Sequence, residues 1–217
     1  MNALQHSRLQ TLRSLYVERL LGETYTNTNL TKPQNKPLNQ QVYEGIENCN
    51  LCKRHQNSKP VIGLFNPTSK LTFITLTPML DSQFNFLNNL KAAMLESIIQ
   101  KVFNCPLKDC SILSLLKCDS NSLNLEEEIN ACLFHLTWQL DNSASKVIVV
   151  FGEILPKRLL NLSKEESFGR IVSLKTKHFL STHALEDMLK NPTLKKEALA
   201  HFKIALQFLN HKIRLTF

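Results

Sequence analysis

Glycine and long apolar runs are scarce in this sequence of 217 residues. Only five glycines occur, and no G-x-G-x-x-G or P-loop pattern is present, which argues against a glycine-rich phosphate-binding loop. The longest wholly apolar run, Val147 to Phe151, has five residues, whereas a membrane span needs about 20. The first residues also lack the apolar core of a signal peptide. We therefore expect a cytoplasmic protein without a membrane span, whose thiols are reduced.

Charge and hydrophobic content indicate a folded domain with a polyanionic partner. The chain carries 26 Lys and Arg residues against 18 Asp and Glu residues, a net charge of +8, and 43% of its residues are hydrophobic. The hydrophobic content is enough to bury a core. The basic excess favours nucleic acid, and the C-terminal segment that includes Lys190 and Lys195 is the first candidate to contact it. The alternative is a solvated basic surface without a partner.

Alternating strand and helix patterns predict the fold class. Continuous apolar strands indicate a parallel sheet that is covered on both faces. Helical spacing fills the intervals between the strands, and Asn191 followed by Pro192 is typical of a helix start. We expect a three-layer α/β/α sandwich with a mainly parallel four-stranded central sheet. The expected strands are Leu71 to Leu76, Ser111 to Leu116, Lys146 to Phe151 and His178 to Thr182, and helices are expected over Phe84 to Lys101, Asn124 to Leu140 and from Asn191 onward.

Two segments are expected along the chain. Residues 1–41 read as an amphipathic helix, over residues 4–21, followed by a polar linker rich in Asn, Thr, Gln and Pro. Residues 42–217 read as the α/β domain. The N-terminal helix has an apolar stripe of its own, so residues 1–21 are a candidate surface for a protein partner.

Four of the six cysteines form a candidate metal site. Cys49 and Cys52 make a C-x-x-C chelate, Cys118 follows the second expected strand, and Cys132 lies in the helix after it. Four thiolates suit either zinc or an iron–sulfur cluster. The alternatives are isolated buried thiols, or a nucleophile–base dyad of Cys118 with His183 at neighbouring strand ends.

The order of several short motifs resembles that of the family 4 uracil-DNA glycosylases, the iron–sulfur branch of that superfamily. The resemblance covers roughly residues 42–209. The matching segments are Glu47 to Arg54 around the C-x-x-C, Gly63 to Pro67, Leu115 to Cys118, Glu126 to Cys132, Val147 to Gly152, Thr182-His183, and Lys190 to Pro192.

This resemblance implies a cofactor and a substrate class. It implies a [4Fe–4S] cluster on the four cysteines named above, with zinc as the alternative metal. It also implies a DNA partner, including single-stranded DNA, and a pocket that accepts a flipped base. His183 matches the late histidine of the family, and Phe84 or Phe86 matches its base-stacking aromatic loop, although either ring also suits a core.

Three departures fall on the motifs that carry the chemistry of that family. Leu76 stands where the family has a glutamate tied to hydrolysis, Ser114 where it has a uracil-reading asparagine, and Ala184 where it has a proline. Asp81 is the nearby carboxylate that could replace the glutamate, or it could cap a helix. We expect a DNA-binding iron–sulfur protein with base excision weakened, altered or lost. The alternatives are an active glycosylase of base excision repair and a non-catalytic scaffold.

Overall fold

The computed structural model describes residues 45–119 and 125–214. The predicted N-terminal helix and linker, residues 1–41, lie outside the described residues, and so does Asn124, the expected start of the second helix.

The described residues form one five-stranded sheet with the order β2-β1-β3-β5-β4. Strands β1, β2, β3 and β5 are parallel, and β4 pairs antiparallel with β5 at the edge. The predicted fold class is confirmed, with one strand more than the four expected. The additional strand has only four residues, is half-buried to exposed, and follows no glycine-rich turn, so its pattern was weak. The bounds are β1 Leu71–Thr75, β2 Cys110–Ser114, β3 Val147–Phe151, β4 Ile171–Leu174 and β5 Lys177–Thr182.

The central strands are buried on both faces, as their continuous apolar sequences predicted. Alternate residues point to opposite faces of a strand, and they enter two separate hydrophobic clusters. Phe73 and Val149 belong to one cluster, whereas Ile74 and Ile148 belong to the other. The sheet is therefore the middle layer of a sandwich.

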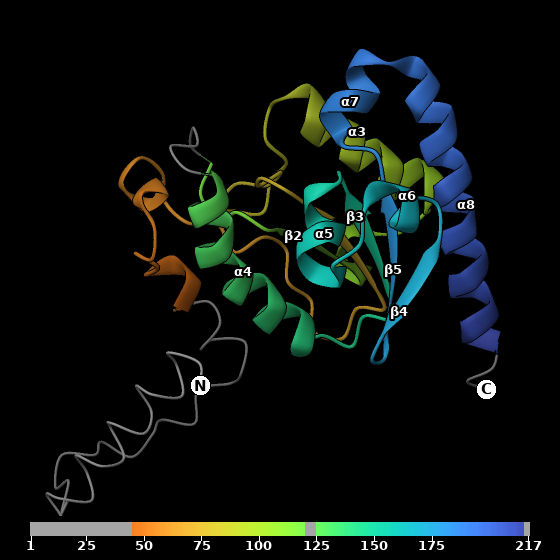
Figure 1. Ribbon diagram of the computed structural model, residues 1–217, viewed down its shortest axis with the longest axis horizontal. Coiled ribbons are helices and arrows are strands. Elements are labelled where there is room, and N and C mark those ends of the chain that lie inside the picture. The colour runs from red at the N-terminus through yellow and green to blue at the C-terminus, as the bar shows by residue number, and fades with distance from the viewer. Residues whose placement is uncertain (1–44, 120–124, 215–217) are drawn as a thin grey trace, which may run out of the picture. The chain divides into compact units, whose positions relative to one another are not determined.

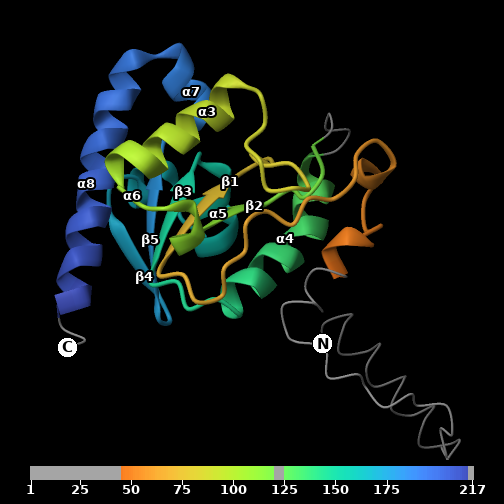
Figure 2. The ribbon, with the colours of Figure 1, turned by 180° about the vertical axis from the view of Figure 1, so that it is seen from behind.

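Helices cover both faces of this sheet. Figure 1 looks onto the face covered by α5, and Figure 2, from behind, looks onto the face covered by α3. Helix α4 packs on the same cluster as α5, and α7 and α8 pack on the same cluster as α3. The bounds are α3 Leu90–Ser97, α4 Leu125–Asp141, α5 Ile154–Leu160, α6 Lys164–Ser167, α7 Leu185–Lys190 and α8 Pro192–Arg214, with short helical turns η1 Lys53–Gln56, η2 Ile98–Val102 and η3 Leu107–Asp109.

Helix starts follow local capping chemistry. The Asn191 side chain accepts the backbone N–H of Thr193 at 3.0 Å, which confirms the expected start of α8. Helix α3 begins six residues later than expected, at Leu90, because Asn89 caps it by accepting the N–H of Ala92. None of the helices in the described part is long and apolar enough to cross a membrane.

Candidate functional site

A pocket of about 260 Å³ opens where the parallel strands end at their carboxyl termini. It is lined by residues that follow β1, β3 and β5, among them Leu76, Gly152 and His183. The chain leaves β1 toward β2 on one side and returns to pair β3 on the other. Ligands of open α/β sheets bind at such a change of direction. We call this site the carboxyl-end pocket.

Two close backbone features shape the carboxyl-end pocket. The Thr75 hydroxyl donates to the carbonyl of Thr77 at 2.8 Å, which fixes the turn that carries Leu76. Gly152 has φ +89, and a Cβ at this position would lie 3.5 Å from the Cβ of Ala184. The chain therefore turns sharply after β3, and the half-buried side chain of Leu76 reaches the pocket beside His183.

His183 is the buried histidine of this pocket, and it has a carboxylate neighbour that the sequence analysis missed. Its Nε2 lies 3.0 Å from Oε2 of Glu197, which is one turn into α8. The two groups are not aligned as a hydrogen bond, because Nε2 is a buried atom without a hydrogen-bond partner. His183 also lines the carboxyl-end pocket, so its ring can meet a bound group. Glu197 is 14 positions away in sequence, so no local motif pointed to it.

A second histidine supports the ring of His183. His201 stacks on it with 5.9 Å between the ring centroids, and Phe168 meets it edge-on at 5.3 Å. Nδ1 of His201 pairs with the Thr182 hydroxyl at 3.0 Å. Burial lowers the pKa of His201, the Glu197 carboxylate opposes this shift, and His183 adds to it. The environment therefore favours a neutral His201 that holds the His183 ring in one plane.

The charged side chains along the wall of this pocket are mainly acidic. Glu153, Glu186 and Asp187 line it together with one cation, Lys164. All four side chains belong to exposed residues at its rim. Lys164 also lies over the ring of Phe168, 5.4 Å from its centroid. A bound polyanion would meet this rim unfavourably, so phosphate contacts must come from elsewhere on the surface.

Asp81, the other candidate catalytic residue, does not line the carboxyl-end pocket. Its Oδ1 accepts the backbone N–H groups of Gln83 and Asn85, at 2.8 and 2.9 Å. These hydrogen bonds lower the pKa of Asp81, the one from Asn85 most. The carboxylate thus organises the turn after β1, and it does not cap α3.

The two candidate stacking residues lie in that same turn. Phe84 is exposed and adopts φ +64, which is uncommon for an aromatic residue. It lines a small cavity of about 50 Å³ with Asp81. Phe86 packs against the core cluster below α3. Of the two rings, Phe84 is the one that a partner can reach.

Ser114 pairs with Thr75 across β1 and β2, but it is not among the residues that line the carboxyl-end pocket. It is buried at the end of β2 and lines a different cavity of about 10 Å³. Its carbonyl accepts the buried ammonium of Lys117 at 2.8 Å. Leu76 and His183 therefore meet in one pocket, and Ser114 does not join them.

The four candidate metal ligands gather in one neighbourhood. Burial raises the pKa of the Cys118 thiol to about 12, and the charges of Cys132, Cys52 and Cys49 add to this shift. The pKa of Cys132 is also raised, again by burial and by Cys52 and Cys49, although the backbone N–H of Lys117 opposes the shift. The four thiols therefore lie close enough for their charges to act on one another.

The geometry of this neighbourhood does not match a single ion. Within the described residues, no three His, Cys, Asp or Glu side chains are placed to hold one metal ion. Thiolates are ligands of zinc and of iron–sulfur clusters alike. His135 lies against this set, with its Nε2 3.0 Å from Sγ of Cys49.

A buried ion pair braces the cysteine segments, and sequence reasoning did not identify it. The Arg54 guanidinium donates to Glu128 at 3.0 Å and to the Cys118 carbonyl through two nitrogens at 2.9 and 3.2 Å. Both side chains are almost fully buried. One guanidinium thus joins the segment after the C-x-x-C, the end of the β2 region and α4.

The candidate DNA-contacting lysines lie where α7 ends and α8 begins. Lys190 ends α7 and Lys195 lies in the first turns of α8, and both are exposed. Lys196 and Lys203 are exposed on α8 as well.

The fold and this pocket define an α/β protein with a ligand site at its strand ends. The family model of the Uracil DNA glycosylase superfamily matches residues 62–203, which is more than half of the chain. The chain therefore belongs to the uracil-DNA glycosylase superfamily, whose proteins act on DNA. The comparison with curated proteins finds no match.

Proposed function

We propose that the protein binds DNA at the carboxyl-end pocket and excises uracil weakly or not at all. The observation that carries this proposal is Leu76, whose aliphatic side chain lines the pocket beside His183. On the resemblance to family 4, this is the position of a glutamate. An aliphatic side chain can neither orient a water molecule nor offset the positive charge that develops on the sugar.

The remaining residues of the pocket support base binding better than hydrolysis. His183 can offer Nδ1 to a base edge, while Glu197 lies at Nε2 and His201 supports the ring. A histidine that is oriented in this way stabilises charge on a leaving base. The pocket has a volume of about 260 Å³, so space for a bound base remains beside Leu76.

Excision of a different base is the second candidate function, and the open pocket favours it over a pure scaffold. The test is an excision assay on single- and double-stranded oligonucleotides that carry uracil, hypoxanthine or 5-hydroxymethyluracil, with His183→Ala as the control. We expect little uracil release. Uracil release at about one turnover per second or faster would contradict the proposal. Release of another base that His183→Ala abolishes would establish the second candidate.

We also propose that Cys49, Cys52, Cys118 and Cys132 hold a [4Fe–4S] cluster, with zinc as the alternative. The coupled thiols and the buried Arg54–Glu128 pair support this assignment. When bound, the cluster would cross-link the chain from residue 49 to residue 132 and neutralise the thiolates. The chain's own part is to hold four sulfurs on three segments that Arg54 joins.

Metal analysis of anaerobically purified protein tests the cluster. We expect iron and inorganic sulfide in equal amounts, visible absorbance, and loss of both in Cys132→Ala. Cys105→Ala is the matched control, because the interactions that shift the pKa of Cys105 come from Cys110 and Asp109 and not from the four proposed ligands. Stoichiometric zinc without iron would contradict the cluster and establish the alternative.

A further inference from the structure

A second and larger pocket, of about 380 Å³, lies at the opposite end of the sheet. It is formed by the C-terminal end of α4, the end of α5 and the hairpin turn between β4 and β5. The parallel strands begin at this end, so the pocket is separate from the carboxyl-end pocket. We call it the amino-end pocket. Its volume falls within the usual range for small-molecule sites, about 300–1,000 Å³.

The floor of the amino-end pocket is apolar. Leu140 and Phe179 are buried beneath it, and Leu159 and Leu174 form its sides. Leu174 is 46% exposed, although it is a large hydrophobic residue at the end of an edge strand. An apolar ligand in this pocket would cover the Leu174 side chain. The apolar surface removed from water would then contribute to the free energy of binding.

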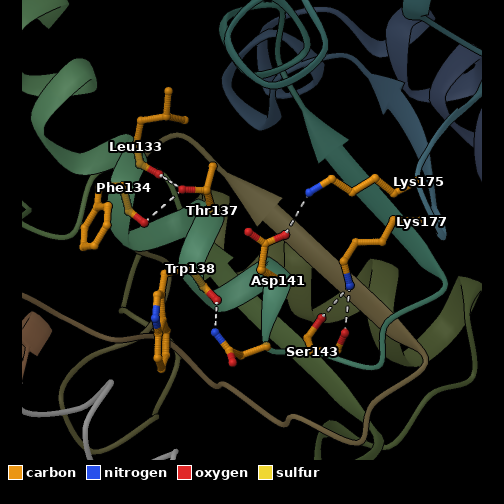
Figure 3. A network of polar contacts seen from close by, with 9 residues as sticks. Leu133, Phe134, Thr137, Trp138, Asp141, Ser143, Lys175 and Lys177 are labelled. Carbon is orange, nitrogen blue, oxygen red and sulfur yellow. Dashed lines mark hydrogen bonds and ion pairs between the residues drawn. The ribbon is translucent and has the colours of Figure 1, made fainter. Parts of the chain in front are cut away.

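The mouth of the pocket has an excess of hydrogen-bond donors. In Figure 3, Lys175 and Lys177 extend from the hairpin toward the end of α4. The Lys177 ammonium donates to the Ser143 carbonyl at 2.7 Å and approaches its hydroxyl at 3.5 Å. Nζ of Lys175 lies 3.8 Å from Oδ1 of Asp141, beyond hydrogen-bond distance. Two ammonium groups have six N–H donors and no acceptor, so most of these donors remain available.

Acceptors are few at this mouth. The hydroxyl of Thr137 donates to the carbonyls of Leu133 and Phe134, at 2.9 and 3.0 Å, and its oxygen can still accept. Asp141 is the one carboxylate among the residues that line the pocket. Burial lowers the pKa of Lys177, Lys175 lowers it further, and Asp141 opposes them. A ligand that brings negative charge between the two lysines would add a second acidic partner to the one that Asp141 provides.

The backbone conformation of Lys175 is unfavourable for a residue that has a side chain. Lys175 has φ +54, the left-handed region that favours glycine. It lies in a two-residue turn between β4 and β5, a place where glycine or asparagine is usual. Its ammonium nevertheless lies over the mouth of the amino-end pocket (Figure 3).

We propose that the amino-end pocket binds a small amphipathic anion, with a carboxylate head between Lys175 and Lys177 and a short apolar chain on Leu140 and Phe179. This site is independent of the carboxyl-end pocket and does not depend on the proposed function. A phosphate head would satisfy the same donors, and the experiment separates the two heads.

NMR titration of the ¹⁵N-labelled full chain with octanoate, octyl phosphate, octylamine and acetate tests the proposal. We expect octanoate to shift the amides of residues 137–143 and 174–179 and to leave those of residues 183–187 unchanged. Acetate, without the apolar chain, and octylamine, with the opposite charge, should bind at least about tenfold more weakly. Tighter binding of octyl phosphate than of octanoate would overturn the carboxylate assignment.

Two variants separate binding from folding. Lys177→Met keeps the apolar stem and should weaken octanoate about tenfold, because one charge-assisted contact is lost. Lys175→Gly should weaken octanoate severalfold and yet raise the melting temperature, because glycine relieves the left-handed strain. Lys203→Met, on the exposed face of α8, is the matched control and should change neither quantity. Equal binding of octylamine, unchanged affinity in both pocket variants, or no shifts at millimolar octanoate would overturn the proposal.

Discussion

The carboxyl-end and amino-end pockets lie at opposite ends of the same parallel strands, and they have charges of opposite sign. Glu153, Glu186 and Asp187 outnumber Lys164 at the first. Lys175 and Lys177 outnumber Asp141 at the second. The chain as a whole carries +8. Net charge therefore describes how a partner is attracted at long range, whereas each site is set by the few side chains that its strand ends present.

The two pockets also differ in the kinds of side chain that they present. The residues of the carboxyl-end pocket at the strand ends form a compact buried group around His183, but no carboxylate follows β1 at the position of Leu76. The amino-end pocket, in contrast, has charged groups at its mouth that no internal partner fully satisfies. The first site therefore presents an aliphatic side chain beside its buried histidine, whereas the second presents two lysines beside one carboxylate.

Restoring the missing charge should produce the largest effect. We expect Leu76→Glu to raise uracil release by about two orders of magnitude, because one preorganised electrostatic group is worth about 10²–10³ in rate. The measurement is single-turnover cleavage of a uracil-containing single strand. Leu76→Gln has the same size without the charge and should give no such gain. Equal gains in both variants, or none in Leu76→Glu with the fold retained, would contradict this account.

A backbone change at the carboxyl end should have the next largest effect. Gly169 has φ +67, and an added Cβ would lie 2.6 Å from the His201 ring. That ring is held by Thr182 and by stacking on His183, so it has little room to move. We expect Gly169→Ala to lower the free energy of unfolding by about 1–3 kcal/mol, measured by urea denaturation.

Two controls show whether that effect is local. Gly45→Ala should be neutral or slightly stabilising, because nothing lies within 4 Å of the new Cβ. Octanoate binding at the amino-end pocket should survive Gly169→Ala. A loss at both pockets would mean that the two ends of the sheet are not independent.

Acidic and alkaline pH should act on the two ends separately. The pKa of His201 is lowered in the folded protein, so the unfolded chain binds more protons just below its ordinary value of about 6.5. Stability should then fall as pH falls below that value, through the lowered pKa, with Glu197 and His183 as the charged or titratable neighbours. The measurement is the urea midpoint between about pH 7 and 5. His201→Gln should flatten this part of the curve, and an unchanged curve would contradict the assignment.

The pKa of Lys177 is also lowered, mainly by burial. Folding therefore favours its neutral form, and the unfolded chain binds more protons between the lowered pKa and the ordinary lysine value of about 10.4. The buried charge of Lys177 lowers the free energy of unfolding at neutral pH. This contribution should disappear, and the free energy of unfolding should increase, as pH rises through this interval. Lys177→Met should remove the share of this gain that comes from Lys177 and leave the acidic limb unchanged, whereas the buried Lys117, whose pKa is lowered to about 7, keeps its own share.

Much of the architecture followed from the sequence, because continuous apolar strands and capped helices depend on local chemistry. The start of α8 at Asn191 and Pro192 is an example. Strand β4 was missed because its short exposed sequence gives no burial pattern. The helix expected from Phe84 was too long because the Asp81 side chain holds that segment in a turn.

The site was harder to predict because its geometry is nonlocal. The sequence indicated His183 and Leu76 through their motifs, and the structure places both in one pocket. It gave no sign of Glu197 or of the Arg54–Glu128 pair, since each joins segments that meet only after folding. Motif order placed Ser114 near Leu76, and the sheet register pairs Ser114 with Thr75, although the Ser114 side chain lines a neighbouring small cavity.

The smallest expected effect concerns the place where DNA phosphates bind. The rim of the carboxyl-end pocket is acidic, so the phosphates should be contacted by the exposed lysines of α7 and α8. Each phosphate contact contributes about one unit to the slope of log affinity against log salt. Lys195→Met should therefore lower that slope by about one unit, measured by fluorescence anisotropy with single-stranded DNA at several salt concentrations.

Lys177→Met is the matched charge change at the opposite end of the sheet, and it should leave the slope unchanged. If the two variants lower the slope equally, DNA is attracted by net charge alone and the pocket does not position it. If Lys177→Met lowers the slope and Lys195→Met does not, the phosphates bind at the amino end. The proposal that DNA binds at the carboxyl end and a small anion at the amino end would then be wrong, because Lys175 and Lys177 would bind the phosphates of DNA.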